Sequence, residues 1–150
     1  MKERLLLKLS GEALKGDNGI ISYLTLEKIA KQIKLLVKAN FNLAIVIGAG
    51  NIFRGATAEK LGMDRSQADY MGMLGTLMNS LAMQEVLEKL SIPTRVMTSL
   101  EVNKVAETYI RRRALRHFEK DRVLILAGGT GSPYFSTDTA AALKAAELDI

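Results

Sequence analysis

The sequence predicts an α/β protein, a three-layer αβα sandwich in which a mainly parallel sheet lies between helices. Three apolar segments that each run into glycines carry this prediction: 4–11 (RLLLKLSG), 42–51 (NLAIVIGAGN) and 122–131 (RVLILAGGTG). Continuous runs of Val, Ile and Leu are typical of strands covered on both faces, as in parallel sheets. Helical patterns separate these segments, and strands that alternate with helices indicate a βαβ architecture. The length of 150 residues fits a single domain, 1–150.

The other elements follow from local patterns. Residues 93–99 form a fourth apolar stretch, which predicts a strand without glycine. A helix is predicted over 25–39, with Thr25 as its N-cap. Its apolar stripe consists of Leu26, Ile29, Ile33, Leu36 and Val37. A longer helix over 66–90 carries apolar or small residues around most of its surface, so we expect it to be buried, in part against a second subunit. Two further helices are predicted, over 103–119 and 137–147.

Composition excludes several kinds of site. The chain has no cysteine and one histidine, so disulfides and thiolate chemistry are excluded and a zinc site would lack its usual sulfur ligands. No apolar run approaches the length of a membrane span. The N-terminal residues do not follow the pattern of a secretory signal. We therefore expect a cytoplasmic protein with no membrane partner.

The net charge of +5 is compatible with nucleic acid, a membrane surface or a small anionic ligand. The densest basic cluster consists of Arg111, Arg112, Arg113 and Arg116. A solvated helix face is the simpler interpretation of this cluster. Aromatic residues make up 5% of the chain and are not interleaved with the basic ones, so stacking on bases has little support. We expect no nucleic-acid partner, and nucleic-acid binding is the last of three functional hypotheses.

Each glycine segment follows a predicted strand, and the carboxyl ends of strands are where open parallel sheets bind ligands. We expect the three turns to converge on one anion site, although a glycine by itself indicates only a tight turn. The P-loop pattern G-x-x-x-x-G-K-[ST] is absent. The dinucleotide pattern G-x-G-x-x-G fails because Phe53 occupies the third glycine position after Gly48 and Gly50. A Rossmann dehydrogenase is therefore disfavoured.

Two cationic side chains lie beside these turns. In an alternating strand Lys8 points opposite to its neighbouring leucines, and near Gly11 its ammonium can reach a bound phosphate. The alternative is that Lys8 extends to water from an edge strand. Arg54 follows Gly50 within the second turn, where a guanidinium can hold a phosphate bidentately.

Acidic and hydroxyl side chains complete the candidate site. Asp69 is expected to open the long helix, either as a partner of the helix dipole or as an acceptor for ribose hydroxyls. Asp138 has the same two interpretations and a third, in which it orients the strand lysine or a magnesium ion. Thr130 and Thr137 offer hydroxyls to a base or phosphate, whereas Ser136 or Thr137 can instead cap the last helix.

Four blocks carry a resemblance to a known family: KLSGEAL (8–14), GAGNIFRG (48–55), GMDRSQADYMGMLGTLMNSLAMQ (62–84) and AGGTGSPYFSTDTAA (127–141). From about Arg4 to Ile150 the chain resembles the bacterial uridylate (UMP) kinases of the amino acid kinase superfamily. The four blocks together distinguish this branch from its acetylglutamate and aspartate kinase relatives.

The resemblance implies phosphoryl transfer from ATP to UMP, giving UDP and ADP in pyrimidine nucleotide synthesis, with Mg²⁺ accompanying ATP. It assigns catalysis to Lys8, Arg54 and Asp138, the last as support for the lysine. It assigns ATP binding to Lys8, Leu9, Ser10, Gly11, Gly50 and Arg54. It assigns UMP binding to Ala49, Asp69, Thr130, Gly131, Ser132, Pro133, Tyr134, Phe135, Ser136 and Thr137, with Asp69 on the ribose. It assigns no protein residue as a direct metal ligand.

The resemblance also implies a homo-oligomer, usually a hexamer built from dimers, and GTP or UTP as possible effectors. Three places depart from the family pattern. Ala49 replaces the middle of three glycines, so its methyl is expected where the UMP phosphate approaches the backbone; Ser132 stands where asparagine is common. Residues 16–24 differ from the usual GxGID pattern in a region that some members use for GTP activation.

Members of this family are longer, and their adenine-binding half comes after the position at which this sequence ends. We therefore expect the C-terminal part of the fold, and with it a complete ATP base site, to be missing from these residues. The alternative function is a non-catalytic UMP- or UTP-binding fragment, or a module that completes a partner chain.

Overall fold

The computed structural model describes residues 1–17 and 19–150, and a parallel sheet forms its centre. In the described residues the strands are β1 (Arg4–Leu9), β2 (Asn42–Ile47), β3 (Thr94–Thr98), β4 (Glu107–Thr108) and β5 (Val123–Ala127). Their order is β1-β2-β5-β3-β4, and all neighbours are parallel. The predicted class is confirmed. Asn18, within the divergent stretch 16–24, lies outside the described residues.

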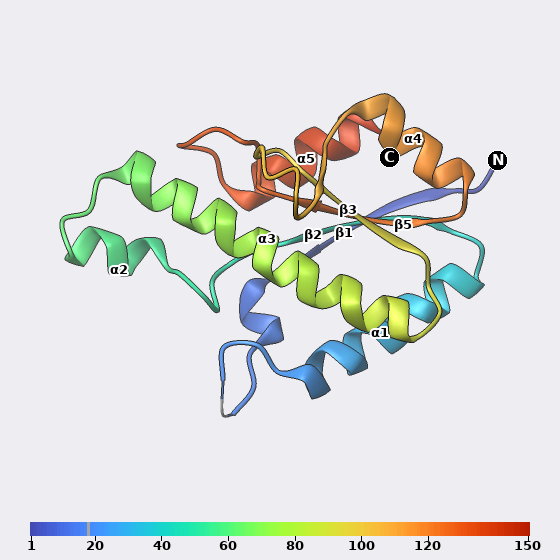
Figure 1. Cartoon of the computed structure of the whole chain (residues 1–150), viewed down its shortest axis with the longest axis horizontal. Coiled ribbons are helices and arrows are strands. Elements are labelled where there is room, and N and C mark those ends of the chain that lie inside the picture. The colour runs from blue at the N-terminus through green and yellow to red at the C-terminus, as the bar shows by residue number, and fades with distance from the viewer. Residues whose placement is uncertain (18) are drawn as a thin grey trace.

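Helices cover both faces of this sheet, as Figure 1 shows, so the predicted three-layer sandwich is confirmed. One layer contains α1 (Tyr23–Lys38) and α3 (Arg65–Lys89), and the other contains α4 (Arg111–Glu119) and α5 (Thr137–Glu147). A short 3₁₀ helix, η1 (Gly11–Leu14), follows β1, and α2 (Gly55–Lys60) precedes α3. The end of α5 coincides with that of its predicted segment, and α3 begins and ends one residue before its predicted segment.

Alternate residues of β1 enter two separate cores, as the two-residue period of a strand requires. Leu5, Leu7 and Leu9 pack against the apolar cluster that β2, β5, α1 and α3 share. Leu6 packs against the second cluster, on the side of α4 and α5. Lys8 belongs to the same strand face as Leu6, and its ammonium is accordingly directed toward α5.

The N-terminus of α1 corrects one prediction. Ser22, not Thr25, is the N-cap: its backbone is extended and its hydroxyl accepts a hydrogen bond from the Thr25 amide at 3.3 Å. Helix formation therefore starts at Tyr23, within the segment that follows η1. Thr25 contributes the amide that is capped, because the cap bonds to the N–H groups of the first turn.

The predicted helix over 103–119 is wrong in its first half. Residues 107–108 form β4, which pairs in parallel with β3, and the Tyr109 amide donates to the Thr98 carbonyl at 2.9 Å. Helical backbone begins only at Arg111. The physical reason is that Thr108, Tyr109 and Ile110 are β-branched or aromatic residues that suit a sheet edge, and β3 offers one.

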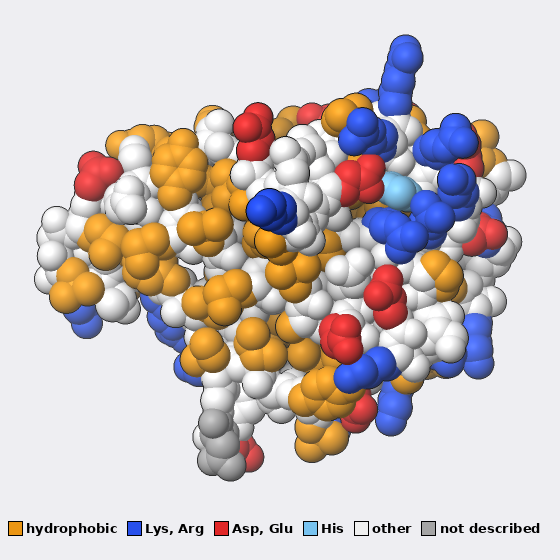
Figure 2. All heavy atoms as spheres, in the orientation of Figure 1, with side chains coloured by type: hydrophobic (Ala, Val, Ile, Leu, Met, Phe, Trp, Pro, Cys, Tyr) orange, Lys and Arg blue, Asp and Glu red, His pale blue; other side chains and the backbone are white. Residues whose placement is uncertain are grey.

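Helix α3 has a buried face and an exposed apolar face. Tyr70, Leu74 and Met78, spaced by four residues, are 41%, 48% and 51% exposed. Figure 2 shows hydrophobic side chains gathered over the region where Figure 1 places α3. The burial of this helix against a second subunit stays a prediction. Across the described residues, no helix has the length and apolar character needed to cross a bilayer.

Candidate functional site

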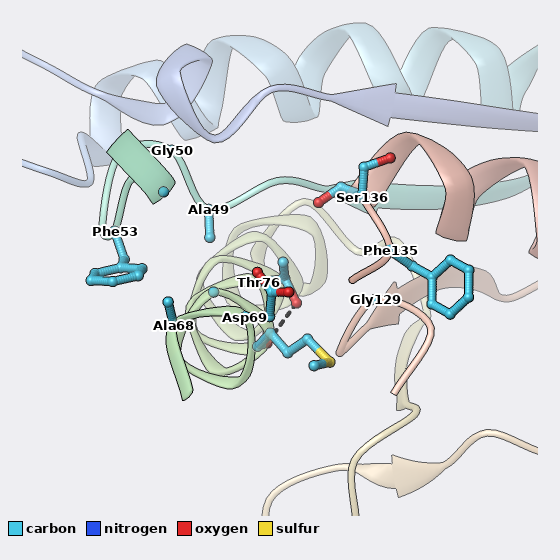
Figure 3. Close-up of a pocket in the computed structure, with 13 residues that line it drawn as sticks. Ala49, Gly50, Phe53, Ala68, Asp69, Thr76, Gly129, Phe135 and Ser136 are labelled. Atoms are coloured by element: carbon cyan, nitrogen blue, oxygen red, sulfur yellow. Dashed lines mark hydrogen bonds between the residues drawn. The ribbon is translucent and has the colours of Figure 1, made fainter. Parts of the chain in front are cut away.

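A cavity of about 250 Å³ opens at the carboxyl ends of β2 and β5, which are neighbours in the sheet. The chain leaves β2 toward α3 on one face and leaves β5 toward α5 on the other, so the two connections diverge there. Open α/β sheets bind ligands at such a switch point. Figure 3 shows the walls: Ala49 and Gly50 follow β2, Gly129 follows β5, and Asp69 comes from α3.

The turn after β5 consists of bare backbone for a geometric reason. Gly128 and Gly131 have φ angles of +78° and +81°, in the left-handed region that side chains disfavour. A Cβ on Gly128 would also lie 2.9 Å from the Oγ1 atom of Thr98. Gly129 therefore lines the cavity in a turn that side chains would distort.

The first glycine turn lies beside the second and outside the cavity lining. A Cβ on Gly11 would lie 2.6 Å from the Gly48 carbonyl oxygen and 2.7 Å from the Gly50 nitrogen. Ser10 caps η1, and its hydroxyl accepts from the Glu12 amide at 3.3 Å. The expected convergence therefore has two parts: the second and third turns share the cavity, and the first turn packs on the second.

Lys8 joins the first turn to the segment that follows β5. Its Nζ atom lies 3.1 Å from Oδ1 of Asp138, in the first turn of α5. Both side chains keep contact with solvent, at 35% and 79% exposure. Of the three interpretations of Asp138, this geometry favours the one in which Asp138 orients Lys8. The ammonium thus lies near the N-terminus of α5, within reach of the same sheet edge as the cavity.

Arg54 interacts with a residue to which the sequence assigned no role. Its guanidinium forms an ion pair with the Glu12 carboxylate, and its Nε atom donates to the Gly50 carbonyl at 3.2 Å. Arg54 does not line the cavity; it is held across the first and second turns. Glu12 lies within the block KLSGEAL, but no sequence signal pairs it with an arginine 42 residues away.

Asp69 lies in the second turn of α3, not at its start, where Asp64 is the N-cap. Its Oδ2 atom accepts from the Tyr134 amide at 2.7 Å. Tyr134 has a positive φ of 72°, so the carboxylate holds a backbone conformation that tyrosine seldom adopts. The Arg65 guanidinium lies 5.0 Å from the centre of the Tyr134 ring. The loop after β5 is therefore tied to α3 beside the cavity.

The residues predicted to surround UMP after β5 divide into two groups. Phe135, Ser136 and Thr137 line the cavity. Ser136 is also the N-cap of α5, since its hydroxyl accepts from the Thr139 amide at 3.1 Å. The residues outside the lining are Thr130, Gly131, Ser132, Pro133 and Tyr134. Within this group the Thr130 hydroxyl donates to the Ser132 carbonyl at 3.0 Å.

The Ala49 methyl packs toward α3. A Cβ built on Gly75 of α3 would lie 2.8 Å from the Ala49 Cβ atom, too close for both residues to carry one. Figure 3 shows the methyl directed toward the helix. Ala49 is 9% exposed while still lining the cavity, so its methyl occupies space that α3 leaves free.

Acidic side chains do not gather at this site. In the residues that the structure describes, no group of three or more His, Asp or Glu side chains is arranged to hold a metal ion. The charges beside the cavity are instead the pair Lys8–Asp138, the pair Arg54–Glu12 and Asp69. Both cations beside the cavity are therefore paired with carboxylates.

Known proteins share both the sequence and the fold. The chain is 63% identical to the uridylate kinase of Aster yellows witches'-broom phytoplasma (strain AYWB), over 100% of this chain and 63% of that protein. It is 57% identical to the uridylate kinase of Limosilactobacillus reuteri (strain DSM 20016), over 98% of this chain and 62% of that protein.

Solved structures agree. The UMP kinase from Ureaplasma parvum matches 99% of this chain and 65% of its own, with a TM-score of 0.95 and 39% identity. The UMP kinase from Bacillus anthracis matches 98% of this chain and 61% of its own, with a TM-score of 0.94 and 43% identity. The chain spans less than two thirds of the length of these relatives.

A family model described as "Amino acid kinase family" matches residues 3–150. This match covers almost the whole chain, including the three glycine turns and the cavity between β2 and β5. Together with the parallel αβα sandwich, it shows that the chain belongs to the amino acid kinase family.

Proposed function

We propose that residues 1–150 form the UMP- and phosphate-binding part of a uridylate kinase, which transfers a phosphoryl group from ATP to UMP. The observation that carries the proposal is the cavity between the second and third glycine turns, with the Lys8–Asp138 pair beside it. The names of the most similar relatives support the choice of UMP. Transfer yields UDP and ADP, a step of pyrimidine nucleotide synthesis.

UMP occupies the cavity in this proposal. Phe135, Ser136 and Thr137 offer an aromatic ring and two hydroxyls to the base and the phosphate, and Asp69, which also lines the cavity, is proposed to bind the ribose. The phosphate approaches the backbone at Ala49, where small side chains leave room. Thr130, Gly131, Ser132, Pro133 and Tyr134 are proposed to contribute to UMP binding from the loop beside the cavity, although none of them lines it.

The ATP phosphates lie on the side of the first turn. Lys8, Leu9, Ser10, Gly11 and Gly50 surround them in this proposal, and Arg54 reaches between the donor and acceptor phosphates. Arg54 must then exchange the Glu12 carboxylate for a phosphate oxygen. Two anions have to be brought in line against their mutual repulsion, so catalysis needs positioning and positive charge, without a covalent nucleophile.

Lys8 supplies the charge nearest the transferred group, and Asp138 orients it from the first turn of α5. A magnesium ion would be held here chiefly by the ATP phosphates and water. Asp138 is proposed to orient Lys8, with which it is paired, and not to ligate the ion directly. When bound with ATP, the ion neutralises charge on the phosphates.

The functional protein is proposed to be a homo-oligomer, a hexamer built from dimers as in the family that the sequence resembles. The exposed apolar face of α3 at Tyr70, Leu74 and Met78 supports self-association. GTP and UTP are proposed as effectors on the basis of the family resemblance alone. Nucleic acid and membranes are not expected as partners.

The proposal is tested by a coupled ADP-release assay with UMP, CMP, dUMP and acetylglutamate as acceptors. We expect turnover with UMP in preference to the others. Turnover with acetylglutamate but not with UMP would overturn the assignment.

A second candidate is a non-catalytic nucleotide-binding module, in which the cavity holds UMP without phosphoryl transfer. Calorimetry that detects UMP binding by this chain, with no turnover at any protein concentration, would select the second candidate. Turnover by the chain alone would exclude it.

A further inference from the structure

Two buried asparagines join α3 to the second glycine turn. Asn79 of α3 is 0% exposed and Asn51 of the turn is 5% exposed. Their amides bond to each other in both directions: Asn79 Nδ2 donates to Asn51 Oδ1 at 2.8 Å, and Asn51 Nδ2 donates to Asn79 Oδ1 at 3.0 Å. Neither asparagine belongs to the cavity lining.

Each amide nitrogen also holds a backbone carbonyl. Asn79 Nδ2 donates to the Gly48 carbonyl at 2.8 Å, and Asn51 Nδ2 donates to the Ile20 carbonyl at 2.8 Å. Both amide nitrogens therefore use their two N–H donors, which leaves no buried donor of the pair unsatisfied. The network ties the start and the end of the second turn, Gly48 and Asn51, to one residue of α3.

The same network sets the distance between the first and second turns. A Cβ on Gly11 would lie 2.6 Å from both the Asn51 Oδ1 atom and the Gly48 carbonyl oxygen. The backbone of the first turn at Gly11 therefore packs closely against the Asn51 side chain and the Gly48 carbonyl. A displacement of Asn51 or Gly48 would move the surface against which the first turn packs.

Stability alone does not require such a network. Burying two amides costs free energy unless every donor is satisfied, and apolar residues of similar volume would fill the space without that requirement. What a satisfied polar network adds is directionality, because hydrogen bonds hold their partners at set distances and angles. A turn that must present its backbone to a phosphate benefits from that constraint.

We propose that Asn79 and Asn51 are positioning residues that hold the second glycine turn in the geometry that receives the substrate phosphate. The inference rests on the proposed function, since it assigns this turn to the phosphate of UMP. The asparagines touch neither the nucleotide nor the reacting atoms. They act through the backbone at Gly48 and, one residue further, at the cavity wall formed by Ala49 and Gly50.

The test compares the binding of UMP and uridine by calorimetry, because the two ligands differ only in the phosphate. In Asn79→Ala and Asn51→Ala we expect the preference for UMP over uridine to fall about tenfold or more, as misplaced positioning groups commonly cost up to about 100-fold. Uridine affinity itself should stay nearly unchanged in the same variants, because uridine carries no phosphate for the turn to receive. A loss of stability without displacement of the turn would leave the preference unchanged.

Ser80→Ala is the matched control. Ser80 is adjacent to Asn79, equally buried, and its hydroxyl donates to the Thr76 carbonyl at 2.6 Å within the helix. Its hydroxyl takes no part in the hydrogen bonds of the asparagine pair, so its removal should lower stability and keep the UMP preference of the unaltered chain. Thermal unfolding followed by circular dichroism identifies a temperature at which every variant is folded, and the binding measurements are made at that temperature.

The outcomes separate the inference from the proposed function. If the unaltered chain does not prefer UMP to uridine, the proposed function fails. If it does, and the folded asparagine variants keep that preference, the positioning role is refuted. If neither variant folds, hydrogen exchange on the unaltered chain tests whether the turn is preorganised. We then expect the amides of residues 48–51 to be protected before UMP is added. Exchange as fast as in an unstructured loop would refute the preorganisation of this turn.

Discussion

Ala49 and Gly75 are expected to behave as a compensating pair. A Cβ on Gly75 would lie 2.8 Å from the Ala49 Cβ atom and 3.7 Å from the Ile52 Cβ atom. Gly75→Ala therefore overpacks a site where only one methyl fits. Ala49→Gly removes the methyl that occupies the space. The combined variant moves that methyl from the turn to the helix, so the conflict disappears and the two changes should not add.

The magnitudes follow from the contact distances. Overpacking costs about 1–3 kcal/mol, while replacing a helical glycine by alanine gains about 1 kcal/mol, so Gly75→Ala should lose about 0–2 kcal/mol of unfolding free energy. Ala49→Gly should lose about 1–2 kcal/mol through the deleted buried methyl and the added chain entropy. The double variant regains the helical preference and buries a methyl again, so it should lie within about 1 kcal/mol of the unaltered chain. The coupling is then about 2 kcal/mol.

Urea denaturation followed by circular dichroism measures the four unfolding free energies. Gly72→Ala is the control on the same helix, because a Cβ there meets nothing within 4 Å and should raise stability by about 1 kcal/mol. Additive losses in the double variant would refute the reasoning. So would a Gly75→Ala variant that is as stable as Gly72→Ala.

Three further predictions concern caps, charge and pH. Ser22→Ala should cost about 1 kcal/mol of unfolding free energy and Thr25→Ala clearly less, because Ser22 is the N-cap of α1; equal losses in urea denaturation would contradict this. Lys8→Ala should change the unfolding free energy by less than about 1 kcal/mol, because the pair that Lys8 forms with Asp138 is solvent-exposed. The same variant should lower the rate of UDP formation by about 100-fold or more. An activity loss that merely follows unfolding would count against the catalytic role. Burial lowers the pKa of Lys144 below the ordinary 10.5, although Glu147 partly opposes the shift. The unfolded chain therefore binds this proton more tightly, and the unaltered chain should gain stability relative to Lys144→Met as the pH rises from 7 toward 10.5; a constant difference would refute it.

Much of the fold could be predicted because its signals are local. The apolar runs at 42–47 and 123–127 are buried strands, and the alternation of Leu5, Leu6 and Leu7 between two cores is the two-residue period of a strand. The start of the last helix was found because Ser136 precedes a run of helix-forming residues. The helix predicted from 103 failed where β-branched and aromatic residues meet the available edge of β3.

By itself the sequence determined the αβα class, the glycine turns at strand ends, and the cationic residues beside them, since each depends on neighbours within a few positions. Tertiary structure alone decided which of these residues meet. Glu12 pairs with Arg54 across 42 residues, Asn51 with Asn79 across 28, and Asp69 with the Tyr134 amide across 65. Hydrogen bonds act over about 3 Å. Local sequence patterns therefore do not reveal a partner that is distant in the chain, because only packing of the whole fold brings the two residues together.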